Sequence, residues 1–217
     1  MLSTPDHTPM PHIQAFAPPP LPQGASSLHY QLYMGHVFHG RQIPPALTRL
    51  LTTYVVTSDK AARAYEAGCQ RIDDHMHRRG NTIEAYIEGL GHFETCINSV
   101  KRALRVFELL VRHRAGIPVD RVIRRRVERY GESVTALRNA IEHIEQMLDG
   151  LHEGDAHLLA FSPDGTAFEI GAHTFAVSDL GTAVGVLYKA GVSIIHALPS
   201  PSENTELNPR PQIETPP

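Results

Sequence analysis

A seven-residue hydrophobic repeat in the middle of the chain constrains the fold more than any other feature. One apolar set recurs at every seventh position: Ile83, Leu90, Ile97, Leu104 and Val111. A second set lies three positions after the members of the first: Tyr86, Phe93, Val100 and Phe107. Spacings of three and four place both sets on one face of a helix. The repeat therefore predicts a long helix from about Thr82 to Arg114 that needs partner helices to bury this face.

Two further helical patterns flank this repeat. One runs from about Ala46 to Arg79 and ends at a predicted turn, Gly80-Asn81. The other covers about Val119 to Leu151, with Gly131 as a predicted kink or interruption. Their apolar stripes are Leu47, Leu50, Leu51, Tyr54, Val55, Tyr65, Ile72 and Met76 in the first, and Val127, Tyr130, Val134, Leu137, Ile141, Ile144, Leu148 and Leu151 in the second. Three long amphipathic helices are typical of a bundle.

The periodicity changes from helical to alternating at about residues 157–177, where turn residues recur at 163–165 and 171–173. This pattern predicts a short β-hairpin or a three-stranded meander. A last helix follows, with Ser178 or Asp179 as its expected cap. The order favours a mainly α fold, an up-and-down four-helix bundle with the small β element inserted before the last helix, as one domain over residues 46–198.

Proline marks both ends of the chain. Residues 1–45 hold nine of the 17 prolines and residues 199–217 hold six more. Proline lacks a backbone donor and blocks helix, so we expect disordered Pro-rich arms at 1–45 and 199–217. Residues 28–40 are more apolar than the rest of the first arm. Two interpretations of this segment stand: it docks on the helical body, or it pairs with another chain.

Composition excludes several classes of protein. The net charge is −3, no apolar run approaches the roughly 20 residues needed to cross a bilayer, and no secretory signal is visible. We therefore expect a cytoplasmic protein without a membrane partner. Cys69 and Cys96 lie within helical patterns among apolar neighbours, which is typical of reduced thiols packed in a core.

The 14 histidines invite a metal interpretation, which spacing does not favour. On a helix, His75 and His77 point about 160° apart. His92 and Cys96 have ligand spacing, but no second ligand pair accompanies them. The chain also lacks glycine-rich nucleotide loops and hydrolase elbows. We expect no metal and no cofactor.

The segment ALRNAIEHIEQML, residues 136–148, carries the candidate catalytic residues. At about 100° per residue, Asn139 points away from the apolar stripe, and Arg138 and His143 lie on opposite flanks of the outward face. One interpretation is an ordinary solvated polar face. The other is a site shared by two copies of this helix across a two-fold axis, the commonest arrangement in homo-oligomers.

The sequence RNAIEH fits the R-x4-6-H motif of the HEPN superfamily, whose members are helical bundles with a polar residue after the arginine. The preceding helix, HFETCINSVKRALRVFELL, also resembles the helix beside that motif. The resemblance covers about residues 46–198. It implies a homodimeric, metal-independent endoribonuclease of toxin or defence type with Arg138, Asn139 and His143 as catalytic residues.

In this scheme His143 takes the proton of a ribose 2′-OH and Arg138 stabilises the phosphate. The resemblance also implies a cognate antitoxin or regulatory protein as partner. In members paired with minimal nucleotidyltransferases, a tyrosine often lies two positions after the histidine, where this chain has Glu145. The alternative is a non-catalytic helical dimer that acts as an RNA-binding or protein-interaction module.

A basic segment leads into the motif. Lys101 to Arg129 holds ten of the 20 Lys and Arg residues against three acids. Clustered cations beside a candidate site are what phosphate binding needs. Solvated helix ends are the other interpretation. The candidate RNA-binding residues are Arg121, Arg124, Arg125, Arg126 and Arg129.

Overall fold

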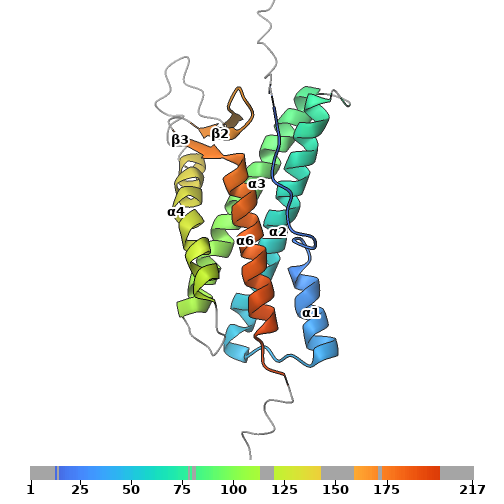
Figure 1. The fold of residues 1–217 in the computed structure, drawn as a ribbon, viewed down its shortest axis with the longest axis vertical. Coiled ribbons are helices and arrows are strands. Elements are labelled where there is room, and N and C mark those ends of the chain that lie inside the picture. Colours follow the sequence, from blue (N-terminus) through green and yellow to red (C-terminus); the bar gives the residue numbers. More distant parts are fainter. Residues whose placement is uncertain are drawn as a thin grey trace, which may run out of the picture.

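The computed structural model describes residues 13, 15–77, 79, 82–112, 120–142, 159–170 and 173–200. Its elements are α1 (Leu28–His39), α2 (Pro45–Met76), α3 (Thr82–Arg112), α4 (Arg121–Glu142), β1 (Ala160–Phe161), β2 (Ala167–Ile170), β3 (His173–Ala176) and α6 (Val177–His196). Figure 1 shows α2, α3, α4 and α6 running along the long axis, with the sheet at one end of them and α1 beside the other end. The mainly helical fold with a small sheet before the last helix is confirmed.

The contact between α2 and α3 is the centre of the core. Tyr54 and Tyr65 on α2 are buried against Phe107 and Phe93 on α3, with ring centroids 6.0 Å apart in both pairs. Gly68 on α2 and Gly89 on α3 permit close approach of the helices. A Cβ added at Gly89 would lie 2.7 Å from Ile72 Cδ1, well inside van der Waals contact.

The predicted helical face of α3 is buried at its centre and turns outward at its N-terminal end. Ile97 is fully buried, whereas Ile83 is 51% exposed, so its assignment to the buried stripe is wrong. The physical reason is geometric. A straight helix with 3.6 residues per turn drifts by about 20° per heptad from a seven-residue repeat. Two heptads before Ile97 that drift amounts to about 40°, and Ile83 also lies in the first turn of α3, where the helix begins.

The predicted β element is a three-stranded antiparallel sheet in the order β1-β2-β3. Phe168 on β2 is paired with both Phe161 on β1 and Phe175 on β3. Phe161 and Phe168 pack on Phe93, with centroids 5.7 and 4.9 Å from its ring. The sheet therefore packs on α3 through Phe93 and lies against α4 and α6.

The predicted turn after Phe161 is present. Asp164 accepts hydrogen bonds from the hydroxyls of Ser162 and Thr166, and these donors, Ser162 first, lower the pKa of its carboxyl. Gly165 adopts φ +75°, a conformation that side chains other than glycine rarely take. A Cβ there would also collide with the carbonyl oxygen of Ala15.

The predicted cap of α6 is wrong. The helix begins at Val177, directly after β3, and its N-cap residue Ala176 makes no side-chain bond. The N–H of Val177 donates instead to the carbonyl of Thr166 at 2.9 Å. Because the sheet already satisfies this donor, Ser178 and Asp179 lie within the first turn instead of capping it.

Residues 15–44 belong to the folded body, in contrast to the disordered arm expected over residues 1–45. α1 docks on α2 and α6, which realises the first interpretation of residues 28–40. Tyr65 holds the extended segment before α1 by donating its hydroxyl to the carbonyl of Pro19 at 3.0 Å. Residues 1–12 and 201–217 lie outside the described part of the chain, so the expectation for them stays a prediction.

Asp59 anchors α1 from the middle of α2. Its side chain is 2% exposed, and its two carboxylate oxygens accept the backbone N–H groups of Leu28 at 2.8 Å and His29 at 2.9 Å. The local N-cap, Ser27, makes no capping bond to the helix. A buried acid in a neighbouring helix therefore does the work that a cap normally does.

We expect Asp59→Ala to lower the free energy of unfolding by roughly 1–3 kcal/mol, because it leaves one buried and one partly buried N–H group without an acceptor. Urea unfolding measures this loss. The matched control is Asp179→Ala, an exposed acid in the first turn of α6, which should cost less than about 1 kcal/mol. Equal losses in the two variants would contradict the anchoring role of Asp59.

A second test compares two glycines on α3. We expect Gly91→Ala to stabilise the protein by about 0.5–1 kcal/mol, because alanine is the better helix former and a Cβ there meets nothing within 4 Å. Gly89→Ala should destabilise it by roughly 1–3 kcal/mol, because its methyl group collides with the buried Ile72. Thermal unfolding measures both. Stabilisation by both variants would refute close packing of α2 on α3.

Candidate functional site

The motif residues that the structure describes lie near the C-terminal end of α4. Leu137 is buried, Asn139 is exposed and Arg138 is half-buried. The predicted helix faces are therefore confirmed for these positions. α4 also passes through Gly131 without the expected interruption. His143, like the rest of the expected helix up to Leu151, lies outside the described residues.

Lys101 on α3 is the residue that joins the motif to the neighbouring helix. Its Nζ donates a hydrogen bond to Asn139 Oδ1 at 2.7 Å. Partial burial, then the nearby charges of Arg138 and Arg105, lower the pKa of the Lys101 ammonium. Arg138 on α4 and Arg105 on α3 thus lie within electrostatic reach of Lys101, which contacts Asn139. A concentration of positive charge of this kind favours an anionic ligand.

Lys101 and Arg105 belong to the basic segment found in the sequence, but no role in the motif was predicted for them. A usable signal was present. Lys101, Arg105 and Arg112 have the spacing of one helix face, beside the apolar stripe rather than opposite it. That placement directs them towards a neighbouring helix. The spacing did not show which helix that neighbour is, or at which level along it the side chains make contact.

A groove with an apolar floor extends along α3 and α4 from this point. We call it the α3–α4 groove. Its volume is about 640 Å³, and its lining includes Leu104, Phe107, Val111 and Val127 as the floor and Glu108, Arg112, Arg124, Glu128, Glu132 and Thr135 around the rim. Three acids face two arginines on this rim. The groove itself is therefore not a channel for phosphate groups.

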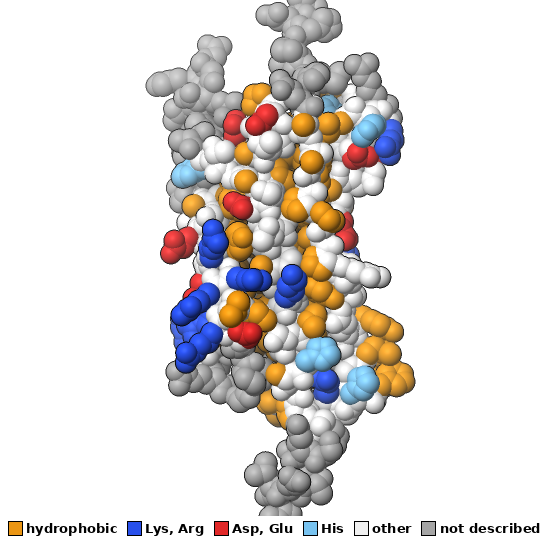
Figure 2. Space-filling model, viewed as in Figure 1, with side chains coloured by type: hydrophobic (Ala, Val, Ile, Leu, Met, Phe, Trp, Pro, Cys, Tyr) orange, Lys and Arg blue, Asp and Glu red, His pale blue; other side chains and the backbone are white. Residues whose placement is uncertain are grey.

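The five candidate RNA-binding arginines are all exposed on α4. Figure 2 shows Lys and Arg side chains gathered over the part of the surface formed by the first half of α4, at the lower left. Arg121, Arg125 and Arg129 share one stripe at four-residue spacing. Arg124 differs, because its Nε pairs with Glu128 Oε1 at 2.8 Å on the groove rim. The stripe is the better candidate for phosphate contacts.

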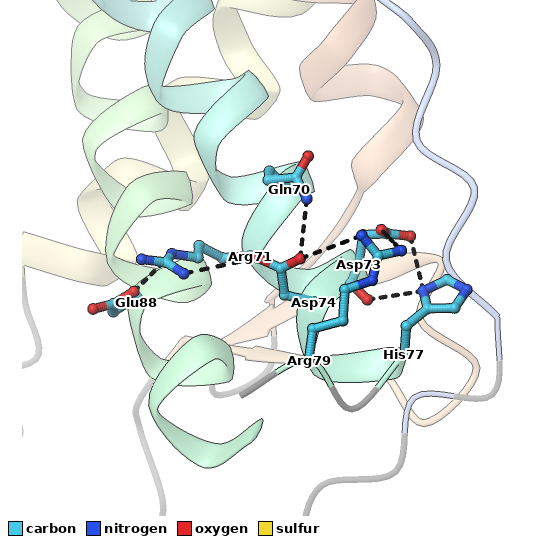
Figure 3. A network of polar contacts seen from close by, with 7 residues as sticks. All are labelled: Gln70, Arg71, Asp73, Asp74, His77, Arg79 and Glu88. Carbon is cyan, nitrogen blue, oxygen red and sulfur yellow. Dashed lines mark hydrogen bonds and ion pairs between the residues drawn. The ribbon is translucent and has the colours of Figure 1, made fainter. Parts of the chain in front are cut away.

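A polar network closes the end of the α2–α3 hairpin (Figure 3). Arg71 pairs with Asp74 at 3.7 Å and with Glu88 on α3 at 2.7 Å, while Asp73 pairs with His77 at 3.1 Å and Arg79 at 3.1 Å. Most of these side chains are well exposed, so each pair contributes little stability. The network ties the two helix ends together.

The histidines of this region do not converge. His75 is buried and its ring packs on Tyr86 with centroids 5.2 Å apart, whereas His77 is on the surface. Among the described residues, no group of three or more His, Cys, Asp or Glu is placed to hold a metal ion.

The two thiols lie in apolar surroundings beneath the N-terminal segment. Burial raises the pKa of Cys69 to about 12, and burial likewise raises the pKa of Cys96. Both are free cysteines, as expected. A thiol with a raised pKa is a poor nucleophile at neutral pH. Neither residue is therefore a candidate for covalent catalysis.

No protein-family model, curated protein or solved structure matches this chain. Within the described ranges, no helix combines the length and the apolar character that a bilayer span requires. The function is therefore inferred from the arrangement of the side chains themselves.

Proposed function

We propose that this chain is a HEPN-like, metal-independent endoribonuclease of toxin or defence type that binds RNA on its α3–α4 face. The observation that carries the proposal is the hydrogen bond from Lys101 to Asn139. It places a second cation beside the Arg138-Asn139 pair of the R-x4-6-H motif, with Arg105 close by. This arrangement supports phosphate binding at the motif.

Cleavage in this proposal uses the RNA's own 2′-hydroxyl. His143 accepts the 2′-OH proton while the 2′ oxygen attacks the adjacent phosphorus. The bond from phosphorus to the 5′ oxygen breaks, which leaves a 2′,3′-cyclic phosphate, and the 5′ oxygen takes a proton from solvent water to leave as a hydroxyl. Arg138 stabilises the negative charge that develops on the phosphate, and Asn139 orients Lys101 towards the same group. A histidine suits the first step because its ordinary pKa is near 6.5.

The exposed stripe of Arg121, Arg125 and Arg129 extends this site in the proposal. RNA tracks along the stripe and reaches the motif near the other end of α4. Such contacts are to phosphates, so they supply affinity without sequence selectivity. The RNA sequence preference would then come from elsewhere in the site.

The proposal has further parts that go with the resemblance. The fold is an up-and-down four-helix bundle, the chain is a cytoplasmic homodimer, and an antitoxin or regulatory protein controls it. The rival function is a non-catalytic RNA-binding or protein-interaction module. Binding of RNA without cleavage would assign the chain to that class.

We expect the triple variant Arg121→Gln, Arg125→Gln and Arg129→Gln to bind RNA more weakly and with a flatter salt dependence. Each lost phosphate contact lowers the slope of log K against log salt by roughly one. Fluorescence anisotropy with a labelled RNA at several salt concentrations measures it. Arg63→Gln is the matched control, an exposed arginine on α2 whose Nη1 approaches the Ser26 carbonyl at 3.5 Å. The same slope in wild type and triple variant would make the stripe a solvated face.

Catalysis is tested at the motif. We expect Arg138→Ala to slow RNA cleavage by about 100-fold or more, because it removes a group that stabilises developing charge. His143→Ala should abolish cleavage, and chelator should leave wild-type cleavage unchanged. Arg63→Ala controls for general loss of positive charge, and circular dichroism checks the fold of each variant. Full activity in His143→Ala would end the enzyme proposal.

Mixing Arg138→Ala chains with His143→Ala chains tests whether the site is shared. If Arg138 and His143 act across two chains, the mixture recovers part of the wild-type activity. If each chain works alone, the mixture stays inactive. Wild-type protein that binds RNA and never cuts it would favour the rival module.

A further inference from the structure

α1 is apolar on both sides, yet the described chain covers only one. Leu28, Leu32 and Gly35 are buried against the body. On the opposite side Tyr30 is 60% exposed, and Tyr33 is 58% exposed. Val37 and Phe38 extend this side, exposed at 50% and 68%. A helix that is apolar all round is normally a buried helix.

The exposed residues form one continuous surface, which we call the α1 stripe (Tyr30, Tyr33, Val37 and Phe38). At about 100° per residue they fall within an arc of about 140°, centred opposite the buried side. Figure 2 shows the corresponding cluster of hydrophobic side chains at the lower right, over α1. Four of the eight large apolar residues exposed in the described chain lie on this one helix.

We propose that the α1 stripe is a dimer interface whose occupant is the same stripe of a second copy of this chain. α1 contains no Lys, Arg, Asp or Glu. In a two-fold contact each residue faces its own surface patch, so any fixed charge would meet its like. The α1 stripe carries no such penalty. The proposal goes beyond RNA cleavage and does not require it.

Lipid is the less suitable occupant. Helices that lie on membranes combine an apolar face with flanking Lys and Arg residues that attract anionic headgroups. α1 has none, and the nearest arginine, Arg41, donates from Nη1 to the carbonyl of Ile195 at the end of α6. The surroundings of the stripe hold histidines instead, at positions 29, 36 and 39.

The area of the stripe sets the strength of the contact. An aromatic side chain offers roughly 150–250 Å², so four side chains exposed by half or more supply on the order of 400 Å² per copy. Two copies then bury about 800 Å², below the roughly 1,200 Å² at which stable interfaces begin. The dimer is therefore weak and dissociates on dilution.

This pairing leaves the α3–α4 face open. α1 packs on α2 and α6, whereas the candidate RNA site lies between α3 and α4. Loss of the α1 contact therefore should not weaken RNA binding by each chain. Association between chains and RNA binding can therefore be measured separately, and each proposal can fail without the other.

Sedimentation equilibrium of the full chain over a wide concentration range tests the pairing. We expect the average mass of wild type to rise with concentration, and Tyr33→Glu and Tyr33→Lys each to lose the weak step of this association that the α1 stripe supplies. Tyr33 lies near the middle of the stripe along the helix axis, so in this proposal the two copies of this position lie near the two-fold axis. An equimolar mixture of the two variants should therefore regain the dimer, because opposite charges now meet.

The matched control is Ile87→Glu on α3, where the replaced side chain is 62% exposed, and it should dimerise like wild type. A wild-type chain that is monomeric throughout, or an association that Tyr33→Glu leaves unchanged, would overturn the proposal. So would a mixture that associates no more than either variant alone, because the stripe would then meet some other surface. RNA binding by Tyr33→Glu at wild-type affinity would show that the two surfaces act separately.

Discussion

The close approach of α2 and α3 supports the rest of the fold. Gly68 and Gly89 remove side chains where Phe93 and Ile72 need the space: a Cβ on Gly68 would lie 3.0 Å from the Phe93 ring. Phe93 then serves as the platform on which the aromatic residues of the sheet pack. The position of the sheet in turn sets where α6 begins, because Thr166 supplies the acceptor for the first N–H of that helix.

Periodicity predicted the helices and strands because each of them buries one face, and a buried face leaves a regular apolar repeat in the sequence. The three long helices, the sheet and the outward direction of Asn139 all followed from it. It failed at Ile83, where the repeat and the helix no longer agree. The cap of α6 was predicted from residue type instead, and it was wrong because a tertiary hydrogen bond replaces a local cap there. Proline density misled over residues 15–44, since extended chain can pack as well as helix does.

The partners of the candidate site could not be predicted in the same way. The bond between Lys101 and Asn139 joins residues 38 positions apart, and that between Asp59 and Leu28 joins residues 31 apart. Spacing tells which side of a helix a residue occupies. It does not tell the height at which two helices meet, because that is settled by packing along their whole length. A sequence thus predicts which cations belong to a site more readily than it predicts which residues those cations contact.

The anchoring of α1 has a consequence for the order in which the protein is made. α1 has no side-chain capping bond of its own, and its acceptor, Asp59, is synthesised only after α1 is complete. Its buried side needs a still later residue, since Leu28 packs where Gly191 of α6 leaves room. α1 can therefore reach its native place only after α6 has been made. During synthesis both of its apolar sides are uncovered, which is the condition under which nascent chains depend on chaperones.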